Sequence, residues 1–436
     1  MKSQPAFAAL AAILAAAGLL TGCSSTQNSA PAKDAFAPGI EEPTTVSLWY
    51  TYPTLFDGTI ASIVKTCEAK VKNLTIDAQS VGADYNELNH RAQTAIASGN
   101  GPDITLEGIG NVEPLSDLPA VNNLTDLVDN GSDFAGLDSF LPLAKAGNGV
   151  QVGVPYAVSA PVLYWNREHF KAAGLDPDKP PTTIEELLAD AAKLANPATG
   201  RVGLSIDYAL SNNFSVPTIM ANSGATVVKD GKPQFASDKS IELLAKLSKG
   251  VKDKSVGVYA DNSQSTQAFD TQQSSMHIGS IASLPQRLKS LGPIFSTTKV
   301  PHAADYSGAY TAFGSGAMWV MYSHSDAKRR AAAEALRCFA GPEATKLPFI
   351  NSGYLPGSES AVKDPDVQKL LQEQPARQAG IDAMKSLAKL PAFGGRDGAR
   401  AADAFRDSWV LGFAGQKNPA DALNEAKAEI EALNVK

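Results

Sequence analysis

The sequence predicts an α/β fold in which mostly parallel strands form sheets covered by helices on both faces. Segments rich in strand-forming residues alternate with helical patterns from residue 44 onward, which is the order typical of a parallel sheet. The chain has 436 residues, of which 44% are hydrophobic, so large cores can be buried in two domains of ordinary size.

The first elements alternate regularly along the chain. The segment 46–50 is rich in strand-forming residues, and apolar side chains then recur at spacings of three and four over 60–67, which predicts a helix. A second strand is expected over 73–78. Apolar side chains over 85–96 share one helix face, and this helix is expected to end in a Ser-Gly-Asn-Gly run before a strand at 103–106.

A helix start is signalled in the middle of the chain. Thr183 is expected to cap a helix that runs to about Leu194, with Glu186 three residues later completing a capping box. Further elements are expected as strands at 162–166, 276–279 and around 318–321, helices at 239–249 and 325–340, and mostly helical chain from 366 to the end, interrupted at 391–395.

The first residues predict where the chain is located. Met1-Lys2 precedes an apolar run over 6–20 that is too short to span a bilayer comfortably, which is typical of an export signal. The Leu-Thr-Gly-Cys motif at 20–23 resembles a bacterial lipobox, in which the cysteine is acylated and the signal is cut just before it. We expect a signal peptide over 1–22 and an extracytoplasmic lipoprotein anchored to the cell membrane at Cys23; an ordinary secretory signal is the alternative.

The segment that follows is expected to be a flexible tether over 23–43, because it is rich in Ser, Ala and Pro and has no periodicity. The formal net charge of -7 argues against nucleic acid or anionic lipid as a partner, since both favour an excess of Lys and Arg. No second apolar stretch approaches membrane-spanning length, so the lipid is the only expected anchor.

Two cysteines remain, Cys67 and Cys338, each inside a helical pattern. Export permits them to pair, but the sequence does not place their Cα atoms within the distance that a disulfide needs. We expect two buried free thiols, with a disulfide as the alternative.

The sequence contains no local motif for catalysis or metal binding. The phosphate-binding G-x-x-x-x-G-K-[ST] is absent, as are H-E-x-x-H, G-x-S-x-G and C-x-x-C. A hydrolase built from two carboxylates needs no local motif and stays open. The histidines are scattered without metal-ligand spacing, at positions 90, 169, 277, 302 and 324.

Aromatic residues at segment ends point instead to binding, because Tyr and Trp offer an apolar ring with a polar tip that suits sugars and polyols. Tyr164, Trp165 and Trp319 lie inside predicted strands and are expected in the core. Tyr85, Tyr156 and Tyr354, next to Gly, Pro or a helix start, are open between core and ligand contact. The other aromatics at segment ends are Trp49, Tyr50, Tyr52 and Tyr208.

Several segments resemble the extracellular solute-binding proteins of ABC importers, specifically the carbohydrate-type group. They occur in the family's order at 84–88, 97–104, 153–156, 163–166, 170–177 and 353–356. The segments 159–164, 314–321 and 418–423 look most like the glycerol-3-phosphate and glycerophosphodiester binders of that group.

The resemblance implies a type II periplasmic-binding-protein-like fold, with two α/β lobes joined by crossing segments and the ligand in the cleft between them. Its partners would be the small solute and the permease subunits of the importer, with no cofactor, no metal, no chemistry on the ligand and a monomeric state. We expect one lobe to comprise 44–156 and 301–348, and the other 157–300 and 349–436.

The resemblance also implies ligand contacts. Tyr85, Ser159 and Tyr354 fall on contacting positions of the glycerol-phosphate subgroup, as do Ser283 and Gly314. Glu107 lies near the position of a hydroxyl-binding carboxylate. Arg396 is the candidate for holding phosphate, because a guanidinium fork suits phosphate geometry, and Arg400 competes with it.

The chain departs from the subgroup in places. Ile184 replaces a tryptophan, which affects packing. Tyr208 and Ser211 stand where two tryptophans can wall the ligand, which favours a different or larger ligand such as a phosphodiester head group or a disaccharide. A neutral mono- or oligosaccharide is the alternative ligand, and a surface hydrolase or an adhesion protein with a vestigial cleft are the alternative functions.

Overall fold

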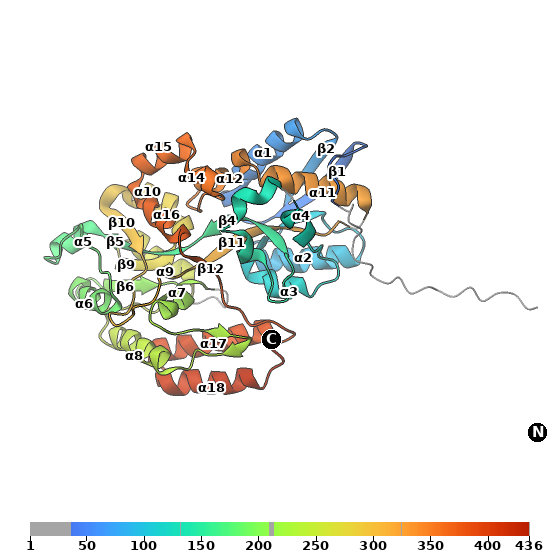
Figure 1. Cartoon of the computed structure of the whole chain (residues 1–436). Coiled ribbons are helices and arrows are strands. Elements are labelled where there is room, and N and C mark those ends of the chain that lie inside the picture. Colours follow the sequence, from blue (N-terminus) through green and yellow to red (C-terminus); the bar gives the residue numbers. More distant parts are fainter. Residues whose placement is uncertain (1–35, 131, 209–212, 324, 436) are drawn as a thin grey trace, which may run out of the picture.

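The computed structural model describes residues 36–130, 132–208, 213–323 and 325–435. Two sheets with helices packed on their faces lie side by side, and the C-terminal helices form a further layer beside the second sheet (Figure 1). The predicted two-lobe α/β fold is confirmed. Cys23, Ser211 and His324 lie outside the described residues.

The first sheet has the order β12-β11-β3-β1-β2, and β4 also pairs with β11. Strands β1, β2 and β3 are parallel, so their carboxyl ends meet at one edge, whereas β11 runs antiparallel to both β3 and β4. The strands are β1 (Thr44–Tyr50), β2 (Leu74–Ser80), β3 (Ile104–Gly108), β4 (Gly153–Ser159), β11 (Ala312–Met321) and β12 (Leu387–Lys389).

The second sheet has the order β10-β5-β9-β6. Strand β5 is antiparallel to both of its neighbours, and β6 is parallel to β9. Its strands are β5 (Pro161–Asn166), β6 (Val202–Ile206), β9 (Ser274–Ser280) and β10 (Phe295–Lys299), and a small hairpin nearby pairs β7 (Val228–Lys229) with β8 (Lys232–Pro233).

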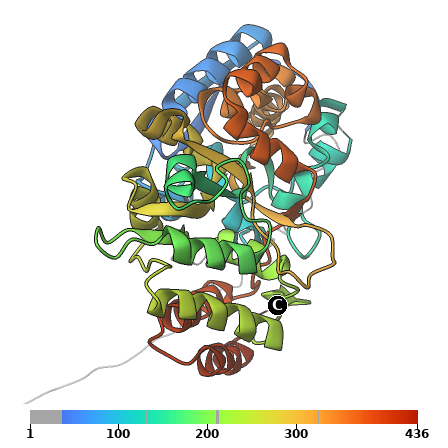
Figure 2. The same ribbon diagram turned by 90° about the vertical axis from the view of Figure 1, so that its left-hand side faces the viewer.

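Helices cover both sheets. Figure 2 shows α8 lying between α6 and the pair α17–α18. The helices up to residue 270 are α1 (Pro53–Lys70), α2 (Tyr85–Ala97), α3 (Val112–Ser116), α4 (Thr125–Asp129), α5 (Arg167–Ala172), α6 (Ile184–Leu194), α7 (Ser215–Ala221), α8 (Asp238–Lys252) and α9 (Asn262–Asp270). The later helices are α10 (Leu284–Leu291), α11 (Asp326–Phe339), α12 (Pro342–Thr345), α13 (Leu347–Asn351), α14 (Glu359–Val362), α15 (Pro365–Glu373), α16 (Gln378–Met384), α17 (Gly398–Phe413) and α18 (Pro419–Glu431).

Most of the predicted elements form at the expected positions, but the segment from 366 onward, expected to be helical up to 391, contains strand β12. Thr183 caps α6, and its side chain and that of Glu186 make both bonds of the capping box. Strand β11 begins earlier than expected, at Ala312, and β12 from the C-terminal part pairs with it. The C-terminal segment thus contributes a strand to the first sheet, while the expected lobe boundaries stay a prediction.

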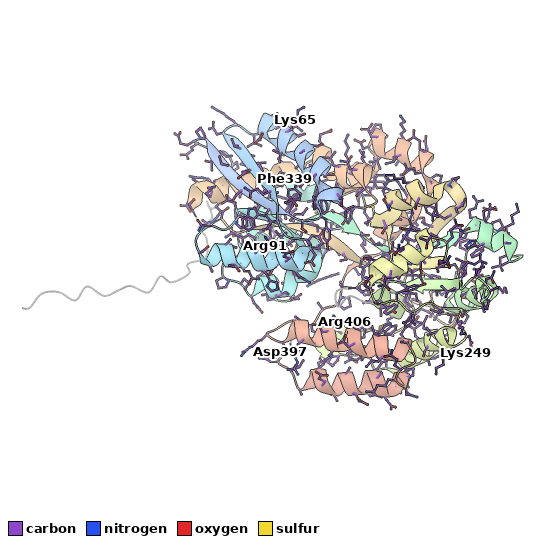
Figure 3. The ribbon with its side chains drawn as sticks, turned by 180° about the vertical axis from the view of Figure 1, so that it is seen from behind. Lys65, Arg91, Lys249, Phe339, Asp397 and Arg406 are labelled. Atoms are coloured by element: carbon purple, nitrogen blue, oxygen red, sulfur yellow. A yellow bond between two sulfur atoms is a disulfide. The ribbon has the colours of Figure 1, made fainter. Side chains whose placement is uncertain are left out.

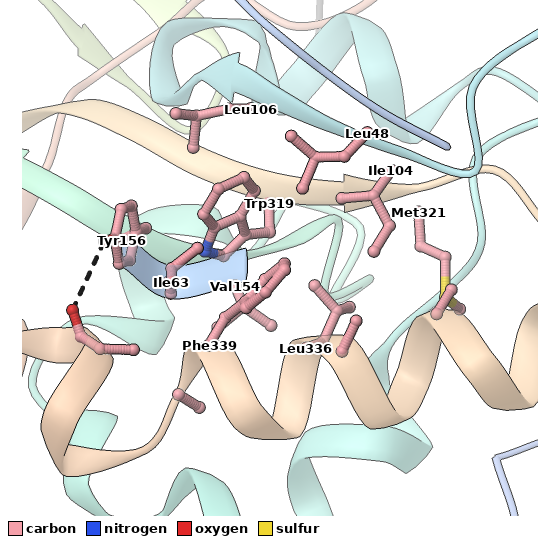
Figure 4. Close-up of a cluster of buried hydrophobic side chains, with 14 of the residues drawn as sticks. Leu48, Ile63, Ile104, Leu106, Val154, Tyr156, Trp319, Met321, Leu336 and Phe339 are labelled. Atoms are coloured by element: carbon pink, nitrogen blue, oxygen red, sulfur yellow. Dashed lines mark hydrogen bonds between the residues drawn. The ribbon is translucent and has the colours of Figure 1, made fainter. Parts of the chain in front are cut away.

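The core of the first lobe is built around a buried tryptophan. Figure 4 shows Trp319 between Tyr156 and Phe339, with ring centroids at 4.9 and 4.8 Å. The Tyr156 hydroxyl donates to the carbonyl of Ala344 at 3.4 Å, so its polar tip is satisfied inside the core. Trp319 is fully buried and Trp165 is almost so, which confirms the expectation that both are core residues; Tyr164 is buried as well.

The expectation of two free thiols is wrong, because Cys67 and Cys338 form a disulfide. Their Cα atoms lie 5.8 Å apart, within the range that a disulfide requires. Cys67 is on α1 and Cys338 on α11, and both helices pack against β1 or its neighbour β2. Residues 271 positions apart in the sequence meet only because the sheet brings these two helices together.

Candidate ligand-binding cleft

A cavity of about 550 Å³ lies between the two lobes. One wall comes from α2, α3 and the chain after β3, and the other from α7, α17 and the chain that precedes α17. Its volume is within the usual range for pockets that bind small molecules, about 300–1,000 Å³. Figure 3 shows Arg91 on α2 along the edge of the first lobe that faces α17, which carries Arg406.

The first wall begins where β3 ends. Asn111 lines the cavity, and its side-chain amide donates to Glu107 at 3.4 Å. Glu107 is fully buried in β3, and burial raises the pKa of its carboxyl to about 7. Its Oε1 atom has no hydrogen-bond partner among the described residues. This oxygen could therefore accept a hydrogen bond, or donate one when the carboxyl is protonated.

Two predicted contact residues, Tyr85 and Tyr354, lie close to each other, and Tyr85 is also near Glu107. Burial, and then the neighbouring Tyr354 and Tyr52, raise the pKa of Tyr85, with a smaller effect from Glu107. Burial also raises the pKa of Tyr354 to about 12, so both phenols are neutral at physiological pH. The ring of Tyr354 stacks on Phe56 at 5.8 Å, which fixes its orientation.

Ser159 and Ser283 lie where chain segments cross between the lobes. The Ser159 and Ser280 hydroxyls are hydrogen-bonded at 2.7 Å, and the Ser283 hydroxyl donates to the Ser280 carbonyl at 3.3 Å. The backbone N–H of Leu355 donates to Val158 at 2.7 Å, which joins the Tyr354 segment to the same crossing. Tyr85, Glu107, Ser159, Ser283 and Tyr354 thus lie near the junction of the lobes, but none of the five lines the cavity.

The second wall is one face of α17. Ala402, Phe405, Arg406 and Trp409 recur at spacings of three and four and line the cavity together. Tyr208 lines it too; its hydroxyl donates to the carbonyl of Tyr259 at 2.8 Å and accepts from its N–H.

The cations of the cleft are paired with carboxylates. Lys389, at the end of β12, forms an ion pair with Glu113. Arg406 contacts Asp403 and Asp407, each at 2.7 Å. Because each cation already faces a carboxylate, the described lining offers an anionic ligand little net positive charge.

The remaining predicted residues lie at the periphery of the cleft. Arg396 is exposed on the turn before α17 and does not line the cavity, and Arg400 faces Glu429 at 3.6 Å on α18. Gly314 pairs with Lys389, and a Cβ atom there would lie 2.9 Å from a terminal methyl group of Leu143, so that side chain would have to shift.

Sequence reasoning missed most of the lining. Asn111 and Glu113 follow the carboxyl end of a parallel strand, which is where ligands bind in open α/β sheets, so their position was a usable signal. The apolar and charged face of α17 was a second signal, through its spacing of three and four residues. The sequence offers no signal for Lys389, because its strand is only three residues long and too short to show a periodic pattern.

None of the helices in the described ranges is both long and apolar enough to cross a bilayer. The same ranges bring no three His, Cys, Asp or Glu side chains together in the manner of a metal site.

Residues 62–377 match the model of a family described as bacterial extracellular solute-binding protein. The chain is 30% identical over 261 residues to the sn-glycerol-3-phosphate-binding periplasmic protein UgpB of Yersinia pestis bv. Antiqua, which covers 54% of this chain and 56% of that protein. It is 28% identical over 265 residues to UgpB of Salmonella typhimurium, covering 57% and 58%. The match thus spans little more than half the length of these relatives.

Solved structures share the fold over nearly the whole chain. The cyclic alpha-maltosyl-1,6-maltose binding protein from Arthrobacter globiformis has a TM-score of 0.77 at 21% identity, covering 89% of this chain and 98% of that one. UgpB from Mycobacterium tuberculosis, solved with glycerophosphocholine, has a TM-score of 0.77 at 18% identity and the same coverage. With a family model matching well over half of its residues, the chain belongs to the bacterial extracellular solute-binding proteins.

Proposed function

We propose that this protein is the solute-binding receptor of an ABC importer and that it captures a small hydroxyl-rich solute between its lobes. The observation that carries the proposal is the cavity of about 550 Å³ between the lobes, lined by aromatic rings and by amide, carboxylate and guanidinium groups. Such a lining suits polyols, which need both ring faces and hydrogen-bond partners. The receptor would return its ligand unaltered and pass it to the permease subunits.

The first candidate ligand is glycerol-3-phosphate or a glycerophosphodiester. Relatives at about 30% identity are named as sn-glycerol-3-phosphate-binding proteins. The predicted contact Tyr208 lines the cavity and would contact the glycerol part, and an arginine would hold the phosphate. Tyr85, Glu107, Ser159, Ser283 and Tyr354 do not line the cavity and would contact only a ligand that reaches deeper into the junction of the lobes.

The second candidate is a neutral saccharide, and the pairing of the cations favours it. Lys389 and Arg406 each contact a carboxylate, and Arg396 does not line the cavity. A phosphate would have to displace a carboxylate or draw Arg396 in, whereas sugar hydroxyls can accept from cations and donate to carboxylates at once.

Isothermal titration with glycerol-3-phosphate, glycerophosphocholine, maltose and maltotriose tests the function, and mass analysis of the recovered ligand shows whether it is unaltered. Arg406→Ala and Arg396→Ala are the matched variants. Loss of the arginine that holds phosphate is expected to weaken glycerol-3-phosphate about thirtyfold, the equivalent of about 2 kcal/mol. Binding of maltose or maltotriose but not of the phosphate esters, unchanged in both variants, would favour the saccharide. Turnover of any ligand would overturn the receptor function.

The protein is also proposed to be a lipoprotein, anchored outside the cytoplasmic membrane through Cys23. The lipobox-like motif at 20–23 and the family of extracellular proteins support this location. The anchor would keep the receptor near the permease without any protein span.

A further inference from the structure

A second hollow lies beside the cleft, on the other flank of α2. It has a volume of about 620 Å³, and Trp49 and Val81 are among the residues that line it. Asn86 and His90 line both this groove and the cleft, so the two are adjacent across one stripe of the helix. Beyond that stripe, the residues that line this groove are Trp49, Val81, Asp84, Glu87, Arg91, Thr94 and Ala95.

We propose that this groove extends the ligand site and takes the sugar units of an oligosaccharide that project out of the cleft over Asn86 and His90. The proposal rests on the receptor function and on its saccharide candidate. It assigns a role to a surface that lies outside the space between the lobes.

The topology of the first sheet places the groove and the cleft at one edge. Strands β1, β2 and β3 are parallel, so their carboxyl ends point the same way. The cleft begins after β3, at Ile109, while Trp49 and Val81 stand at the ends of β1 and β2. Ligands of open α/β sheets bind outside the carboxyl ends of the strands, and the groove continues along that edge.

The chemistry of the groove suits a sugar ring. Trp49 is half-buried, so part of its side chain is open to a ligand, and Val81 and Ala95 add apolar surface. Arg91 stands at the rim, where its Nε and Nη2 groups donate to Glu87 at 2.9 and 2.5 Å. A guanidinium has five N–H donors, so others remain for ligand hydroxyls.

The helix geometry explains how one ligand can reach both hollows. Asn86 and His90 are four residues apart and therefore form one stripe along α2. Glu87, Arg91 and Thr94 form the next stripe, on the groove side. A chain of sugars leaving the cleft crosses the first stripe and meets the second, without any movement of the helix.

Titration with maltose, maltotriose and maltohexaose tests the extension. We expect Arg91→Ala and Trp49→Ala to weaken maltohexaose five- to tenfold and to leave maltose unchanged. Lys65→Ala, at an exposed position on α1 away from the groove, is the charge-matched control and should bind every ligand normally.

Fluorescence gives a second, independent measurement. The difference in emission between the native protein and Trp49→Phe reports on the groove, and we expect it to respond to maltohexaose but not to maltose. The proposed role of the groove would be overturned if affinity did not depend on ligand length, or if the variants lost equal affinity for short and long ligands. Binding of glycerol-3-phosphate without any saccharide would overturn the groove and leave the receptor function intact, whereas no binding of any solute would overturn the receptor function.

Discussion

Glu107 belongs both to the buried core of the first sheet and to the surroundings of the cleft. It is buried at the end of a strand, beside the predicted contact Tyr85 and behind Asn111 of the cleft. Burial raises the pKa of its carboxyl from 4.5 to about 7, because the charged form loses its hydration. A carboxyl that titrates near neutral pH can present either a donor or an acceptor to the groups around it.

We predict a pH dependence of stability that Glu107→Gln reduces. Because the native pKa lies above the unfolded value, the native state binds more protons between about pH 4.5 and 7. The resulting stabilisation is fully present below about pH 4.5 and is lost as the pH rises through about 7. Relative to the native protein, the variant should gain about 3 kcal/mol in free energy of unfolding between about pH 4.5 and 8.

Urea unfolding at several pH values measures this gain. Burial also raises the pKa of Asp207 to about 7, so a slope of the same sign persists in both proteins and only their difference reports on Glu107. Parallel curves for the two proteins would show that Glu107 does not titrate in this range.

At the scale of elements, the crossing between the lobes is held by hydroxyl groups. Ser159 at the end of β4 bonds Ser280 at the end of β9, and thereby links the last residues of strands from the two sheets. The resemblance assigns Ser159 to the ligand, whereas its buried side chain already has a protein partner.

A double-mutant cycle separates these roles. Ser159→Ala and Ser280→Ala should each lower the free energy of unfolding by about 1 kcal/mol, with little further loss in the double variant, because both remove the same hydrogen bond. If Ser159 instead serves the ligand, its variant should lower affinity while Ser280→Ala does not, and the two stability losses should add.

The disulfide between α1 and α11 is a second link between distant elements. It closes a loop of 271 residues, so it restricts the unfolded chain strongly. Reduction is expected to lower the free energy of unfolding by about 2–5 kcal/mol. Urea unfolding with and without dithiothreitol measures the effect, and the variant with both Cys67→Ala and Cys338→Ala should show no response to the reductant. An equal response in that variant would mean that the reductant acts elsewhere.

At the scale of the whole molecule, anchoring and folding are expected to be independent. Cys23→Ala should release the protein from membranes and leave its melting temperature unchanged, because the expected tether over 23–43 separates the lipid from the cores. Membrane fractionation and thermal unfolding measure the two effects. Unchanged membrane partition would contradict the lipobox, and a lower melting temperature would contradict the tether.

The sequence by itself determined the order of elements, because hydrophobic periodicity and capping are local. The capping box of Thr183 and Glu186 depends on side chains three residues apart, and the strand at Thr44–Tyr50 on its own composition. The burial of Trp319 followed from its place in a strand. The two-lobe architecture and the predicted contacts around Tyr85 came from resemblance rather than from any local pattern.

Only the tertiary structure decided which residues far apart in the sequence come into contact. The disulfide needed two helices on one sheet, and the cleft needed α2 and α17, whose side chains line one cavity although they are some 300 residues apart. The ion pair of Lys389 and Glu113 likewise joins a short strand to a distant helix. Burial, charge pairing and cavity shape depend on such distant neighbours, and periodicity along the chain carries no information about them.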